Sequence, residues 1–213
     1  MEKGRRLVGP AVATVVSLIV LKTAGLLVSA IVLGLGLGVT LGGKITALGR
    51  LEFRAPALFA LGVVAALVSS ASVPLDMQRG AYALSFWLLA IFVAANLRTP
   101  GAIVIAAGLL AQALAVTANG GAMPYLSEAA TIAGATIREG NPLQIALGAD
   151  SQLPFLADVI PFPFNGRAYS VGDLLIAAGI IWLLLSVTLQ ARSQTRRARL
   201  PPTRGEVIQQ PRE

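Results

Sequence analysis

Long apolar blocks separated by short polar stretches dominate the hydrophobic pattern of this chain. Each block is about 18 residues long, close to the roughly 20 helical residues that cross about 30 Å of hydrocarbon. The pattern predicts an all-α fold, a polytopic transmembrane helix bundle of five or six spans with a long extracytoplasmic segment before the last one. The expected spans are residues 7–21, 24–41, 55–73, 81–97, 101–118 and 171–189.

The first apolar block is too long for a single crossing. Residues 7–41 carry one charge, Lys22, and a helix of that length would reach about 50 Å at 1.5 Å per residue. Two arrangements fit. Either residues 24–41 span the membrane after a partial segment, or a short span at 7–21 turns back at Lys22 and Thr23.

The basic residues favour six spans. With both termini in the cytoplasm, 13 of the 17 Lys and Arg residues lie inside, as the positive-inside rule requires. Five spans would leave the basic N-terminus outside. We therefore expect a multi-pass protein of the bacterial cytoplasmic (inner) membrane, with a transmembrane domain at 1–189, an outer segment at 119–170, and a basic, disordered cytoplasmic tail at 190–213.

Composition supports a membrane location and limits the partners. Hydrophobic residues make up 55% of the chain and charged residues 13%, about half the share found in soluble domains. Of the 14 arginines, six lie in residues 192–212 with no aromatic residue among them, which indicates no nucleic-acid partner. The expected partners are membrane lipid in general and anionic lipid at the C-terminal tail.

The absence of cysteine and histidine limits the chemistry that is possible. The 213 residues contain neither type, which excludes disulfides, thiol nucleophiles, histidine bases and the common zinc sites. We expect no cofactor and no metal. Carboxylate, hydroxyl, amide, arginine and lysine groups remain.

A glycine repeat occupies residues 33–38 of the second expected span. Gly34 and Gly38 form a small-xxx-small pair suited to close helix contact. Ordinary glycine in a bilayer helix explains the pattern equally well. A nucleotide-binding loop does not fit, because no strand precedes the glycines.

The outer segment, residues 119–170, carries the features most typical of a functional region. Ser127–Arg138 has the spacing of a short surface helix that ends at Gly140. Residues 162–169 predict a hairpin, with Asn165-Gly166 at its turn.

Two aspartates near the last span are candidate catalytic residues. Asp158 lies in an apolar stretch, and Asp173 stands at the entrance of the span. Two carboxyls brought together share a proton and can act as acid and base on a water molecule. Structural alternatives remain open. Ser170 and Asp173 have the spacing of a capping box, and Asp158 fits a solvated loop carboxylate or an ion pair with Arg167.

Asn119 and Arg167 are candidate substrate-orienting residues. Asn119 follows the fifth expected span, where its amide could lie beside the aspartates. Asn119 with the two glycines that follow also has the composition of a helix end, so a capping role is the alternative.

The sequence contains four short motifs: Gly42-Gly43-Lys44, Asn119-Gly120-x-x-Met123-Pro124, Leu156-x-Asp158 and Ser170-x-Gly172-Asp173. Their combination resembles a family of small bacterial membrane proteins known only as a domain of unknown function. The resemblance covers residues 26–189 and implies a polytopic membrane protein with no established activity.

Residues 156–180 are also similar to the closing part of the lipoprotein signal peptidases. That resemblance implies that Asp158 and Asp173 form an aspartyl dyad. The Asn-x-x-Asp-Arg stretch of that family is missing upstream, and residues 123–153 are foreign to it.

These observations leave three hypotheses for the function. The first is a non-catalytic structural or partner-binding membrane protein, favoured because no complete catalytic motif is present. The second is an aspartyl peptidase-like hydrolase that acts at the outer membrane interface through Asp158 and Asp173. The third is a small transporter subunit, which ranks last because the expected spans carry almost no charge.

Overall fold

The structure is a computed structural model that describes residues 25–134, 141–163 and 166–197. Most of these residues are helical. The expected span at 7–21 and the turn at Lys22 lie outside the described residues. The same holds for residues 198–213 of the expected tail.

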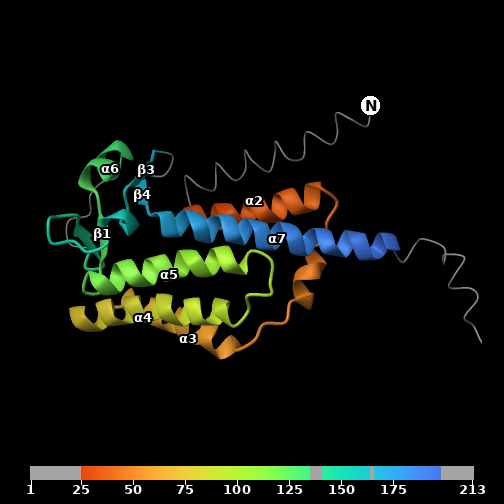
Figure 1. Cartoon of the computed structure of the whole chain (residues 1–213), viewed down its shortest axis with the longest axis horizontal. Helices are drawn as coiled ribbons and strands as arrows, with labels where there is room; N and C mark the ends of the chain where they lie inside the picture. Colours follow the sequence, from red (N-terminus) through yellow and green to blue (C-terminus); the bar gives the residue numbers. More distant parts are fainter. Residues whose placement is uncertain (1–24, 135–140, 164–165, 198–213) are drawn as a thin grey trace, which may run out of the picture.

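Five long helices pack in one continuous series, which we call the row; in the view of Figure 1, α3 lies partly behind α4. In spatial order, α2 packs against α7, α7 against α5, α5 against α4, and α4 against α3. A 3-10 helix, η1 (Ile45–Arg50), follows α2. The bounds of the row are α2 Leu26–Thr40, α3 Pro56–Ser69, α4 Leu75–Ala94, α5 Ala102–Ala118 and α7 Val171–Arg197.

Two of these helices, α4 and α7, are long and apolar enough to cross a membrane, judged by length and composition alone. The other three are apolar but shorter, with 15 residues in α2, 14 in α3 and 17 in α5. The expected mostly helical fold is confirmed, whereas five or six crossings do not follow from helix length.

Two helices extend beyond the expected spans. Helix α4 begins at Leu75 rather than at residue 81, because Pro74 fits the position before a helix and Asp76 in the first turn favours the positive end of the helix dipole. The Gln78 side chain also ties the preceding loop down, donating to Ala71 O at 2.9 Å. Helix α7 continues past residue 189 to Arg197, so the expected tail from residue 190 begins as helix.

Glycines bring α5 and α7 into very close contact. A Cβ built on Gly179 of α7 would lie 2.9 Å from the backbone nitrogen of Ile105 and 3.0 Å from the carbonyl oxygen of Gly101. One contact further along, a Cβ on Gly108 would lie 2.6 Å from the carbonyl oxygen of Gly172. Only residues without a side chain allow the two backbones to approach this far.

Helix α2 approaches the opposite side of α7 in the same way. A Cβ on Gly34 would lie 3.1 Å from Ile181 Cα, and one on Gly38 would lie 3.0 Å from Thr188 Cβ. The prediction that Gly34 and Gly38 serve close helix contact is therefore confirmed. Helix α7 is held between two glycine-bearing neighbours.

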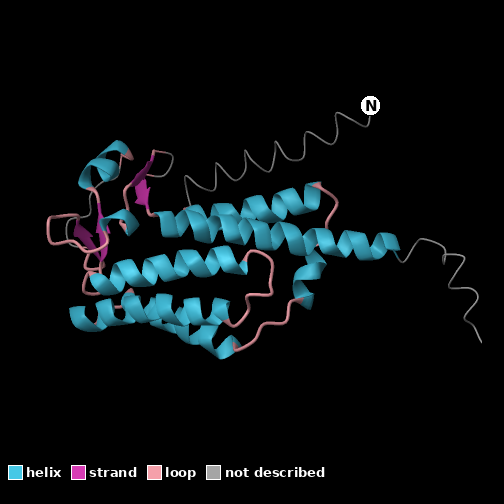
Figure 2. Ribbon diagram, in the orientation of Figure 1, coloured by secondary structure: helices cyan, strands magenta, loops and turns pink. Residues whose placement is uncertain are grey.

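Residues 119–170, which we call the cap, fold over one end of the row. Figure 2 shows that the strands are confined to this end. The two small sheets are minor additions to a fold expected to be entirely α-helical. The cap contains β1 Met123–Tyr125 paired in parallel with β2 Gln144–Ala146, α6 Ser127–Ile132, η2 Pro154–Leu156, and β3 Ile160–Phe162 paired antiparallel with β4 Arg167–Tyr169.

The predicted hairpin is confirmed in its strands, since β3 and β4 pair antiparallel; Asn165 of the predicted turn lies outside the described residues. The predicted helix at 127–138 is confirmed at its start, but α6 ends at Ile132, and residues 135–138 lie outside the described residues. Gly134, with φ at +73°, ends the helix early by adopting a left-handed conformation that other residues rarely take.

Substituting Gly179 tests the contact between α5 and α7. We expect Gly179→Ala to lower the free energy of unfolding by about 1–3 kcal/mol, because the added methyl group overlaps the backbone of α5. Thermal unfolding of the purified protein in detergent measures the loss. The matched control is Gly80→Ala in α4, where no atom lies within 4 Å; this change should stabilise the helix by up to about 1 kcal/mol. Equal effects of the two substitutions would contradict the contact.

Candidate functional site

A capping box starts α7 beneath the cap. The Ser170 hydroxyl accepts a hydrogen bond from the Asp173 backbone N–H at 3.1 Å, and Asp173 Oδ2 accepts one from the Ser170 backbone N–H at 2.9 Å. The Ser170 hydroxyl also lies 3.0 Å from Asp173 Oδ2. Each residue thus satisfies an N–H that the helix leaves free, which confirms the capping interpretation of Asp173.

Gln112 of α5 connects this capping box to the neighbouring helix. Its side-chain amide donates to Asp173 Oδ1 at 2.7 Å and to the Ser170 hydroxyl at 3.0 Å. Gln112 is 4% exposed, and its Oε1 has no hydrogen-bond partner. Sequence reasoning missed this residue, although a single amide inside an otherwise apolar helix was the available signal.

Asp158 is fixed inside the cap by its own backbone hydrogen bonds. Its N–H donates to the carbonyl oxygen of Pro124 at 2.9 Å, and its carbonyl accepts from the Leu126 N–H at 3.0 Å. The side chain is 8% exposed, and Oδ1 has no hydrogen-bond partner. The expectation of a solvated loop carboxylate is therefore wrong.

Burial changes the acidity of this carboxyl. Loss of hydration, and then the nearby Asp173 carboxylate, raise the pKa of Asp158 to about 8. Most Asp158 side chains accordingly hold a proton at neutral pH. The phenol of Tyr82, from α4, lies within electrostatic range of both aspartates.

The buried polar cluster that results draws on four separate parts of the chain. A carboxyl that keeps its proton can donate a hydrogen bond, and the negative charge of Asp173 favours this protonated form of Asp158. Buried apolar residues adjoin the cluster, since Tyr82 packs against an apolar group that contains Val116 of α5 and Met123 of β1. The members of the cluster are Tyr82, Gln112, Asp158, Ser170 and Asp173.

The two candidate substrate-orienting residues do not join this cluster. Asn119 donates to the carbonyl oxygens of Ala115 at 2.8 Å and Gln152 at 2.9 Å, and it accepts from the Gln152 N–H at 2.9 Å. Its amide fastens the end of α5 to the cap, as the capping alternative proposed. Arg167 is exposed on β4, with its guanidinium near Gly25. No ion pair joins it to Asp158 within residues 25–134, 141–163 and 166–197.

The same described ranges contain no group of three acidic residues that could hold a metal ion. With no cysteine or histidine in the sequence, the cluster offers hydrogen bonds and proton exchange.

The fold is a row of apolar helices with a cap at one end and a buried polar cluster beside it. These features define a class of helical protein and are not specific to one activity. The chain belongs to a family of unknown function, DUF5317, whose profile matches residues 50–185. The predicted resemblance to a domain of unknown function is confirmed, although the match begins after the Gly42-Gly43-Lys44 motif. No curated protein and no solved structure matches the chain.

Replacing Asp158 tests whether it is buried in its protonated form. The carboxyl has a pKa near 3.8 in the unfolded chain and about 8 in the folded one, so the folded state binds more protons between these values. The free energy of unfolding should then fall as pH rises from about 4 to 8, by up to about 1.4 kcal/mol per pH unit. Asp158→Asn is neutral at every pH, so it should flatten this slope and make the protein more stable than wild type at pH 8.

Thermal unfolding in detergent across this pH range measures the effect. The control is Asp150→Asn, which changes an exposed carboxylate of the cap and should keep the wild-type slope. An unchanged slope in Asp158→Asn would show that Asp158 is not held protonated.

Proposed function

We propose that this chain is a multi-pass integral membrane protein of non-catalytic function, whose row of helices binds lipid and whose cap lies outside the cytoplasm. The observation that carries the proposal is the exposure of large apolar side chains along the whole row. Those exposed include Leu27, Val28 and Ile31 of α2, Phe59, Leu61, Val64 and Leu67 of α3, Leu84 and Ile91 of α4, Ile103, Leu110 and Leu114 of α5, and Leu174 and Trp182 of α7.

A protein surrounded by water rarely exposes apolar patches of this extent. Only 11% of the most apolar 18-residue stretch of α4 is buried, whereas the core helix of a soluble protein would be mostly buried. Among the described residues, no further element covers the large apolar side chains exposed along the helices. Hydrocarbon is the solvent in which such apolar surfaces are stable.

The lengths of α4 and α7 support a crossing of the membrane, and the lengths of α2, α3 and α5 are compatible with one. The 20 residues of α4 rise about 30 Å, the thickness of the hydrocarbon core. Helices α2, α3 and α5 rise about 21–26 Å. They lie beside α4 and α7 in the same row, and a bilayer accommodates a short helix by local thinning at modest cost.

The charges at the two ends support the proposed orientation. Along the chain the helices alternate in direction, so the loops after α2 and α4 share one end with the C-terminus of α7 (Figure 1). Lys44, Arg50, Arg54 and Arg98 belong to that end, with Glu52 as the acidic residue among them. The capped end holds more acidic than basic described residues. A cytoplasmic location of the basic end follows from the positive-inside rule.

The polar cluster supports a structural role better than catalysis. Asp173 already accepts hydrogen bonds from Ser170 and Gln112, and Asp158 is buried inside the cap. A transporter has less support still, because α2, α3 and α5 carry no charged residue.

A second candidate is an aspartyl hydrolase at the outer interface. It is favoured by one feature, the burial of Asp158 close enough to Asp173 for the charge of Asp173 to help raise the pKa of Asp158. Hydrolysis would require the cap to open, so that water and substrate reach the pair.

Cysteine accessibility tests the proposed topology, because the chain has no cysteine of its own. Asp150→Cys introduces a thiol in the exposed part of the cap, and Gly49→Cys introduces one at the opposite end. In intact cells we expect a membrane-impermeant maleimide to label Asp150→Cys and not Gly49→Cys, and to label both after permeabilisation. Release of the chain from membranes by alkaline carbonate, or labelling of Gly49→Cys in intact cells, would contradict the proposal.

Cleavage of a membrane-anchored reporter peptide separates the two candidates. If the chain is a hydrolase, vesicles that contain the purified protein cleave the peptide, and Asp158→Asn and Asp173→Asn each abolish the cleavage. Asp76→Asn, an exposed carboxylate at the start of α4, serves as the control and keeps the activity. We expect no cleavage by the wild-type protein, as a non-catalytic function requires.

A further inference from the structure

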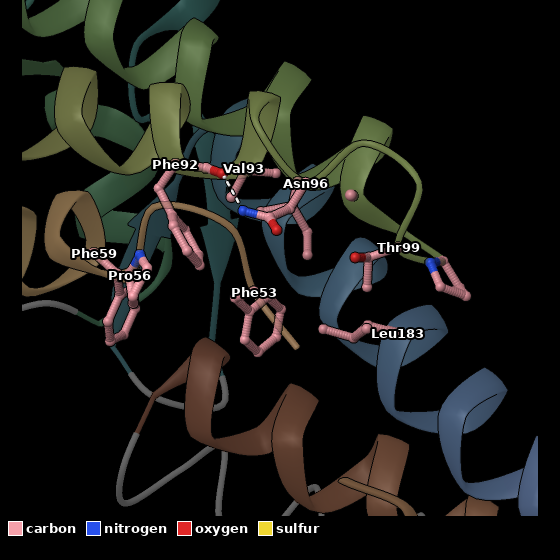
Figure 3. Close-up of a pocket in the computed structure, with 11 residues that line it drawn as sticks. Phe53, Pro56, Phe59, Phe92, Val93, Asn96, Thr99 and Leu183 are labelled. Atoms are coloured by element: carbon pink, nitrogen blue, oxygen red, sulfur yellow. Dashed lines mark hydrogen bonds between the residues drawn. The ribbon is translucent and has the colours of Figure 1, made fainter. Parts of the chain in front are cut away.

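An apolar pocket lies at the basic end of the row, far along the helices from the cap. Its volume is about 330 Å³, and α3, α4, α5 and α7 all contribute to its walls. Figure 3 shows the rings of Phe53, Phe59 and Phe92 on one side and Leu183 of α7 on the other. The ring centroids of Phe53 and Phe59 lie 5.7 and 5.4 Å from that of Phe92, so the aromatic wall is one packed group.

The pocket offers no free hydrogen-bonding group, although Asn96 lines it. The Asn96 side chain donates to the carbonyl oxygens of Arg54 at 3.0 Å and Phe92 at 2.7 Å, and it accepts from the Arg54 N–H at 2.7 Å. These bonds hold the loop that carries Phe53 against α4. They also use the polar atoms of Asn96, so a ligand of this pocket must be a hydrocarbon group.

Two arginines stand directly beside lining residues. Arg54 follows Phe53 in sequence, and Arg98 precedes Thr99, which also lines the pocket. Both side chains are exposed, and neither forms an ion pair with any residue in the part of the chain that the structure describes. An anionic group next to the pocket would meet this positive charge.

We propose that this pocket binds one acyl chain of an anionic phospholipid, with the lipid phosphate held at Arg54 and Arg98. The volume lies at the lower end of the range of about 300–1,000 Å³ typical of small-ligand pockets, which suits a single chain rather than a whole lipid. The lipid comes from the leaflet at the basic end of the row. This inference rests on the proposed membrane location and adds a specific site and a headgroup class to it.

Lipid binding to the full-length protein tests the proposal. The protein is purified in mild detergent and titrated with dioleoyl-phosphatidylglycerol or dioleoyl-phosphatidylcholine, and native mass spectrometry counts the bound lipids. We expect one phosphatidylglycerol per chain, bound more tightly than phosphatidylcholine. The double variant Arg54→Gln/Arg98→Gln should lower this preference by about twenty-five-fold, since each arginine near an anionic lipid is worth about fivefold.

A pocket-filling variant gives the second arm. Leu183→Trp puts an indole into the space and should abolish the single high-affinity site. Its matched control is Leu61→Trp, at an exposed position of α3 outside the pocket, which should bind phosphatidylglycerol as the wild type does.

The outcomes separate this site from the membrane proposal. If the chain resists carbonate extraction but Leu183→Trp and Leu61→Trp bind lipid equally, the pocket proposal is wrong and the lipids are only those that surround any membrane helix. Equal affinity of the wild type for the two headgroups likewise overturns it. Release of the wild-type chain by carbonate overturns the membrane proposal itself.

Discussion

Close contact between α7 and its two glycine-bearing neighbours is the interaction on which the rest of the structure depends. In the proposed membrane location, helices gain little from burying more apolar surface, so close backbone approach and dense packing would hold them together. Gly101, just before α5, and Gly108 of α5 meet Gly179 and Gly172 of α7. The contact is local, but its consequences extend to the polar cluster.

The position of the cluster follows from this packing. A Cβ on Gly172 would lie 3.0 Å from Cγ of Gln112, so the same close approach that joins the helices brings the Gln112 amide to Asp173 and Ser170. If α5 and α7 lay further apart, the Gln112 amide could not reach Asp173, and the Asp173 carboxylate would lose a hydrogen-bond donor. The same close contact therefore packs the two helices together and supplies hydrogen-bond partners to their buried polar side chains.

Sequence reasoning recovered the features that local pattern encodes. Apolar blocks predicted three of the five long helices, α2, α3 and α5, to within a few residues. The spacing of Ser170 and Asp173 predicted the capping box, and Gly34 with Gly38 predicted a helix contact. Errors arose where a charged residue was taken as a loop signal. Because Asp76 and Arg79 are charged, the start of this helix was predicted at residue 81, although Asp76 belongs to the first turn of α4.

The parts that sequence could not supply depend on contacts between distant segments. The burial of Asp158 results from backbone bonds to Pro124 and Leu126, more than thirty residues away in the printed sequence. The parallel pairing of β1 with β2 involves three residues in each strand, too few for a periodic signal. Asn119 looked available to a substrate because its partner, Gln152, lies in another part of the cap.

The unbroken length of α7 has a mechanical consequence. From Val171 to Arg197 it contains no proline, and sharp bends in helices need proline or a comparable interruption. One stiff rod therefore joins the capping box to the arginine-rich end. The two ends keep a fixed separation of about 40 Å at 1.5 Å per residue, and they turn and shift together.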